Sequence, residues 1–73
     1  MKNVLPLFVW ANAHGEAKII DRILIKVLPD LLKHNCKITP EQVENSQELN
    51  IPESLYTEIC VVAEELIGER YPS

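Results

Sequence analysis

The feature that most constrains this chain is one segment, residues 16–35, whose apolar residues cover more than one face of a helix. Apolar residues recur there at spacings of three and four, which predicts an amphipathic helix. The principal stripe consists of Ile20, Leu24, Val27 and Leu31. A second set widens it and consists of Ile19, Ile23, Leu28 and Leu32. A stripe this wide is not buried by one neighbouring element, so we expect the helix to make contacts on two sides.

Pro29 lies inside this predicted helix. Proline has no backbone N–H to bond to the carbonyl of Ile25, so we expect the helix to kink or split there. His34 and Asn35 are expected to end it. Ile25 lies on the opposite, mainly polar side. The polar residues of that side are Arg22, Lys26, Asp30 and Lys33.

The first thirteen residues form a nearly continuous apolar run that fits a short helix or a buried strand equally well. Pro6 allows two arrangements, because proline is tolerated in the first turn of a helix or on an edge strand. In either arrangement we expect Trp10 to anchor the run on the core. A strand over residues 3–10 would pair across a dimer and would make the fold α+β.

The same run resembles a secretory signal peptide, with one lysine, an apolar stretch and then Ala-x-Ala. It is shorter than the roughly 15–30 residues of such peptides, and Pro6 interrupts its apolar stretch. No part of the chain reaches the roughly 18 consecutive apolar residues that a transmembrane helix needs. We therefore expect an uncleaved cytoplasmic chain that does not contact a membrane.

The second half of the chain contains a strong signal for a helix start at Thr39. Thr39 and Gln42 fit a capping box, and Pro40 suits the first helical position. We expect this helix to reach about Leu49, with Val43 and Leu49 as its apolar anchors. A break at residues 50–52 then precedes a last helix over about 52–68, which Gly68 is expected to end.

These patterns predict a single small all-α domain over residues 1–73, a bundle of three to four helices. Size scaling gives about 12,000 Å² of surface for the unfolded chain and about 4,600 Å² for the folded one. Apolar burial then contributes on the order of 110 kcal/mol, and ordering the chain costs about as much. Because a monomer would be marginal, we expect a homodimer or a complex with another subunit. The residues expected in its core or dimer contacts are Trp10, Ile20, Leu24, Val27 and Leu31.

The charges are divided between the two halves of the chain. Residues 1–38 carry a net charge of +3 and residues 39–73 a net charge of −7, which together give −4. In one interpretation the two halves attract each other within the fold. In the other, the glutamates form a surface that meets a basic partner. The residues assigned to partner binding are Glu53, Tyr56, Glu58, Glu64 and Glu65.

The function that these patterns favour is a small, acidic, non-enzymatic protein-interaction module that binds a basic macromolecule. Its size and charge resemble those of small inhibitors such as antitoxins, immunity proteins and phage anti-defence factors. One alternative is a transcription regulator with a helix-turn-helix over residues 39–67, and another is a structural subunit of a larger assembly. DNA phosphates would repel the start of the last helix, which carries Glu53 and Glu58, so we expect no nucleic-acid binding.

No pattern indicates catalysis or a cofactor. Two histidines and two cysteines match a tetrahedral zinc site in number, but only His34 and Cys36 are close in sequence. The same two residues do not define a nucleophile with an oriented base. Cys60 lies on an apolar side of the last helix, where cysteine packs as a small hydrophobe. We expect no catalytic residue, metal or cofactor, and reduced thiols, although the sequence leaves a Cys36–Cys60 disulfide open.

Overall fold

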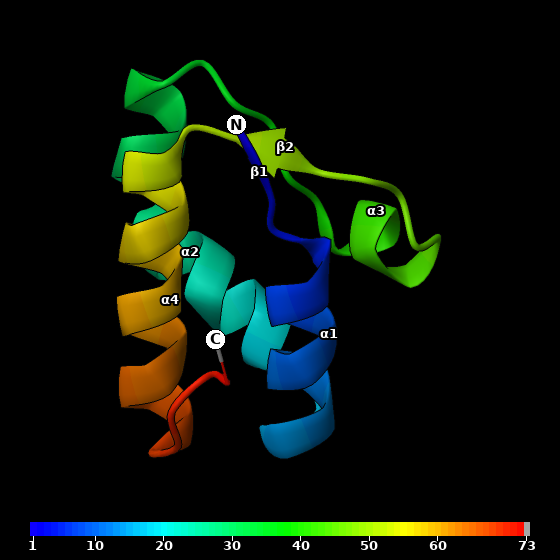
Figure 1. Cartoon of the computed structure of the whole chain (residues 1–73). Coiled ribbons are helices and arrows are strands. Elements are labelled where there is room, and N and C mark those ends of the chain that lie inside the picture. Colours follow the sequence, from blue (N-terminus) through cyan, green and yellow to red (C-terminus); the bar gives the residue numbers. More distant parts are fainter. Residues whose placement is uncertain (73) are drawn as a thin grey trace.

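Four helices and a short two-stranded sheet make up the computed structural model, which describes residues 1–72 (Figure 1). Helices account for 62% of the chain, which confirms a small, mostly helical domain. The sheet corrects the all-α prediction. The elements in chain order are β1 (Lys2–Asn3), α1 (Leu5–His14), α2 (Ile19–Lys33), α3 (Pro40–Glu44), β2 (Asn50–Ile51) and α4 (Glu53–Ile67).

The apolar N-terminal run forms helix α1, with Pro6 in its first turn. The predicted alternative, a strand over residues 3–10, is wrong, because most of these residues are helical and the strand β1 covers only Lys2–Asn3. β1 pairs antiparallel with β2 of the same chain, with Lys2 opposite Ile51. α1 ends at Gly15, where an added Cβ would lie 2.8 Å from Ile19 Cγ1. A side chain there would push α1 and α2 apart.

Helix α2 runs without a break through Pro29, so the predicted split is wrong. Pro29 and Ile25 both lie on the exposed side of α2, where water can bond to the carbonyl that proline leaves without a donor. The helix begins at Ile19 rather than at residue 16. It ends as predicted, with His34 as the C-cap and Asn35 in the left-handed region at a φ of 53°.

Helix α3 begins with the predicted capping box, since Thr39 and Gln42 each accept a hydrogen bond from the other's backbone N–H. It ends at Glu44 and not at Leu49. Ser46 adopts a left-handed φ of 54°, and the chain then turns so that the Leu49 side chain enters the core. This turn aligns residues 50–51 with β1.

Helix α4 follows β2 directly, with Pro52 as its N-cap. Gly68 ends it as predicted. Its φ of 80° is left-handed, and its N–H bonds to the carbonyl of Glu64 at 2.8 Å. No helix within residues 1–72 combines the length and the apolar character needed to cross a membrane.

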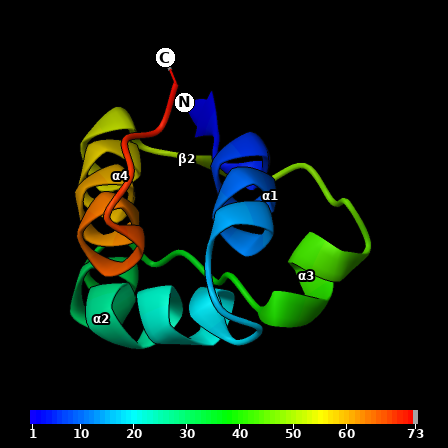
Figure 2. The ribbon, with the colours of Figure 1, turned by 90° about the horizontal axis from the view of Figure 1, so that it is seen from below.

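The core lies where α1, α2 and α4 meet. Figure 2 shows α1 and α4 nearly end-on, with α2 running across them. The largest fully buried side chains are Phe8, Leu7, Ile19, Ile23, Leu55, Ile59, Val4 and Val27. The accessible surface is 4761 Å², close to the roughly 4,600 Å² expected for a compact monomer of this mass.

The residues predicted for the core or the dimer contacts divide into two groups. Ile20, Val27 and Leu31 lie in the core of the single chain, with at most 9% of their surface exposed. Leu24 and Trp10 are half-buried at its edge. Trp10 stacks on His14 and meets Tyr71 edge-on, with ring centroids 5.3 Å apart in both pairs. It therefore holds the C-terminal tail against α1.

Candidate protein-interaction site

The residues predicted to bind a partner all lie on α4, but they occupy two sides of it. Glu58 and Glu65 are two helical turns apart and share one side. Tyr56 and Glu64 are half-buried on another side, beside the C-terminal tail. Glu53 is exposed in the first turn of α4. The structure therefore separates the predicted set into an outward pair of carboxylates and a tail-facing cluster.

The tail-facing cluster is held by the Glu64 carboxylate. One of its oxygens, Oε2, accepts hydrogen bonds from the Cys60 Sγ–H and from the backbone N–H of Tyr71, both at 3.1 Å. These bonds hold the pKa of Glu64 below its usual value. The contacts therefore stabilise the fold at pH values above the ordinary glutamate pKa, and their contribution is lost as the pH falls through the lowered one.

The Cys60 thiol and the Tyr56 phenol of this cluster are held in their neutral forms. Burial, followed by the hydrogen bond to Glu64, raises the pKa of the Cys60 thiol to about 11. Burial, followed by a hydrogen bond with Tyr71, raises the pKa of Tyr56 to about 12. The Lys2 ammonium lies 4.6 Å from the centroid of the Tyr56 ring, a cation–π contact. Sequence reasoning missed this cluster, because it brings the two ends of the chain together.

We expect Cys60 to react slowly with iodoacetamide at about pH 8, because the thiolate is the reactive form and little of it is present. Glu64→Gln keeps an oxygen acceptor for both hydrogen bonds but removes the negative charge. The pKa of Cys60 should then fall, and alkylation should become several times faster. Mass spectrometry measures the rate, with Cys36 of the same sample as the internal reference. An unchanged rate at Cys60 would show that the carboxylate does not control this thiol.

The outward side of α4 carries carboxylates without ion-pair partners. Glu58 and Glu65 are exposed, and Val61 between them exposes 46% of its surface. Within residues 1–72 the only ion pair closer than 4.0 Å joins Arg22 to Glu16, at 3.6 Å. The carboxylates of this side therefore remain available to another molecule.

The two oppositely charged halves of the chain pack together: α2, from the positive half, lies against α4, from the negative half. Glu58 lines a depression with Lys33 of α2 and with His34, the C-cap of that helix. No carboxylate of α4 comes within 4.0 Å of a lysine or arginine in residues 1–72. The expected attraction between the halves thus operates only over longer distances, where solvent and salt screen it.

The sequence predicted only in part that one apolar side of α2 stays exposed. The broad stripe predicted contacts on two sides, and the structure buries one of them. Ile25, Leu28 and Leu32 remain exposed on the other side. The signal for this surface was the position of Ile25 among polar residues.

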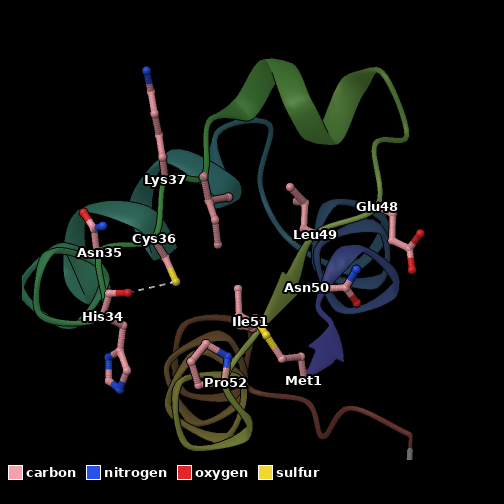
Figure 3. A pocket seen from close by; sticks show the side chains of 11 residues that line it. Met1, His34, Asn35, Cys36, Lys37, Glu48, Leu49, Asn50, Ile51 and Pro52 are labelled. Carbon is pink, nitrogen blue, oxygen red and sulfur yellow. Dashed lines mark hydrogen bonds between the residues drawn. The ribbon is translucent and has the colours of Figure 1, made fainter.

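His34 and Cys36 lie beside a depression of about 420 Å³ between the 34–38 linker and residues 48–52 (Figure 3). The Cys36 thiol contacts the His34 carbonyl at 3.6 Å, whereas Nδ1 of the His34 ring bonds to the Asp30 carbonyl at 2.9 Å. The imidazole is thus oriented by the end of α2 and not by the thiol. Both cysteines are free thiols, and residues 1–72 contain no group of three potential metal-ligating side chains.

Comparisons with known proteins give no match: no family model, no curated protein and no solved structure is significantly similar to the chain.

Proposed function

We propose that the chain is a small acidic protein-interaction module that binds a basic macromolecular partner through the outward side of α4. Glu58 and Glu65 supply the charge, and Val61 supplies apolar contact area between them. The observation that supports this most directly is that both carboxylates are exposed and unpaired within residues 1–72. The module carries no catalytic step, metal or cofactor in this proposal.

The electrostatics explain why such a surface favours binding. Clustered like charges destabilise a small fold through mutual repulsion. A cationic partner relieves that repulsion, speeds association and disfavours acidic competitors. Tyr56 and Glu64 make no direct contact with the partner in this scheme, because they lie on the tail-facing side of α4. The size and charge suit an inhibitor of antitoxin, immunity or phage anti-defence type, which covers a basic region of its target.

Reversing the two outward charges tests this proposal. The immobilised double variant Glu58→Lys/Glu65→Lys should recover basic proteins from a lysate of the source cells about tenfold less efficiently than the wild type, because attraction becomes repulsion. The proteins lost should be those that high salt releases from the wild type. Quantitative mass spectrometry of the eluates measures the difference.

The matched control is Glu41→Lys/Glu44→Lys, which changes the net charge by the same amount on α3. It should recover the same partner as the wild type. Equal losses in both double variants would mean that net charge alone governs recovery. That outcome, or recovery that the α4 reversal leaves intact, would contradict the proposed surface.

The homodimer stays a prediction, and the structure changes which residues it would use. Ile20, Val27 and Leu31 are buried within one chain and cannot also face a second one. The exposed residues of α2 are the largest group of exposed apolar side chains left for self-association, besides Met1, Val9 and Val61 elsewhere on the chain. Sedimentation over a range of protein concentrations measures whether the chain is a monomer.

A further inference from the structure

Helix α2 has a second apolar side that the fold leaves uncovered. Ile25 exposes 72% of its surface, Leu28 49% and Leu32 71%. Their spacings of three and four place them in one stripe along the helix. Single exposed apolar residues are ordinary on monomers, whereas a contiguous stripe of large ones marks an interaction surface.

A recess adjoins this stripe. It has a volume of about 490 Å³ and lies between α2 and the linker that leads into α3. Leu24, Ile25, Leu28 and, at the rim, the exposed Asp21 line it from the helix, Ile38 and Thr39 line it from the linker, and Pro40 lines it from the start of α3. We call the exposed stripe and the adjoining recess together the groove. It is a mainly apolar surface with a hollow at one edge, which suits large apolar side chains from another molecule.

Cations border the groove along the other edge of the stripe. Arg22, Lys26 and Lys33 are all exposed there, and Lys26 and Lys33 lie two turns apart on the same side of α2. Within residues 1–72 neither lysine has a carboxylate within 4.0 Å, and Arg22 meets only the exposed Glu16. The groove therefore has a positive edge on a chain whose net charge is −4.

We propose that this groove binds an amphipathic helix of a partner protein that carries carboxylates along one edge. Its apolar residues, spaced by three and four, pack on Ile25, Leu28 and Leu32, and one of them enters the recess. Its carboxylates face Lys26 and Lys33. This is the helix-in-groove mode of recognition, with charge complementarity setting the orientation. Its apolar residues are separate from the acidic side of α4, although Lys33 at its edge shares a depression with Glu58, and it needs a partner of the opposite charge.

Charge complementarity favours an acidic helix over two other molecules that could cover an apolar stripe, a second copy of the chain and an anionic membrane. A second copy packed two-fold on α2 would bring Arg22, Lys26 and Lys33 of both copies to one interface, where they repel. An anionic membrane would attract these cations, but its charge extends over a far larger area than one helix and would also repel the rest of the chain, whose net charge is −4.

Two synthetic peptides of about 20 residues test the proposal, a length above the roughly 12–15 residues below which isolated helices are marginal in water. Both have leucines at spacings of three and four, and they differ only in glutamate or glutamine along one flank. Fluorescence anisotropy should show that the full chain binds the glutamate peptide about tenfold more tightly. Lys26→Glu/Lys33→Glu should remove this preference without weakening the glutamine peptide.

Leu28→Asn should weaken both peptides about tenfold, since Leu28 lies in the middle of the stripe. Val9→Asn on α1 is the matched control, with an exposed fraction of 52% against 49% for Leu28, and should bind both peptides normally. Circular dichroism checks that each variant is folded. The charge variant tests the proposal even where Leu28→Asn does not fold.

Three results would overturn the proposal. The first is equal binding of the two peptides. The second is self-association without peptide that Leu28→Asn abolishes, which would assign the groove to a second copy. The third is co-sedimentation with vesicles of phosphatidylcholine and phosphatidylserine that Leu28→Asn abolishes, which would assign it to a membrane. None of them bears on Glu58 and Glu65, so the proposal for α4 stands or falls separately.

Discussion

Replacing Phe8 by alanine is expected to destabilise the fold by about 3–5 kcal/mol, the largest effect of any single substitution considered. Phe8 of α1 is fully buried and is the largest fully buried side chain of the core. Its loss removes apolar burial and leaves a cavity that rigid helices fill only partly. Small domains have only about 5–15 kcal/mol of stability in total, so a large share of the molecules should be unfolded.

Thermal unfolding followed by circular dichroism measures the Phe8→Ala effect. The Tm should fall by about 4–8 °C for each kcal/mol lost in a domain of this size. Val9→Ala is the control, because Val9 is the next residue of α1 and exposes 52% of its surface. Its effect should stay within about 0.5 kcal/mol. Similar Tm values for the two variants would contradict the position of the core.

Features that depend on local sequence were predicted well. The start of α3 depends on Thr39 and Gln42, which bond to each other's backbone three residues apart. The end of α4 depends on the ability of Gly68 to adopt a left-handed φ. The long α2 depends on the period of its apolar residues. In all three cases the deciding contacts lie within a few residues in the sequence.

Features that depend on distant contacts were not predicted. Residues 45–49 continue the helical pattern of α3, but Ser46 turns the chain and Leu49 enters the core. The two residues of β2 become a strand only because β1 lies beside them. Nothing within the segment itself signals a partner that is nearly fifty residues away.

The same distinction between local and distant contacts applies to the two candidate surfaces. The sequence predicted that α4 carries the glutamates, yet the packing of the tail decides that Glu64 is engaged while Glu58 and Glu65 face outward. The sequence also predicted that α2 has more apolar surface than one contact can bury. The positions of α1 and α4 decide that Leu31 is covered and Leu32 is not.

The second large effect is expected for Asn3→Ala, which should cost about 1–3 kcal/mol because backbone donors lose their acceptor. Asn3 Oδ1 accepts hydrogen bonds from the N–H of Leu5 at 3.1 Å and of Leu49 at 2.9 Å. One side chain thus bonds to the first residue of α1 and to the loop before β2. Urea unfolding measures the stability, and amide hydrogen exchange at Leu49 should become faster.

Asn3→Asp separates the hydrogen bonds from the side chain's other contributions. Aspartate keeps an oxygen acceptor at the same position, and its charge is favourable near the N-terminus of α1. It should therefore retain most of the stability and the slow exchange at Leu49. If Asn3→Ala matches the wild type in both measurements, the backbone bond from Val4 to the Leu49 carbonyl, at 2.8 Å, holds this segment without the side chain. If both variants lose stability equally, the amide group itself is required, and the acceptor role assigned to Oδ1 is wrong.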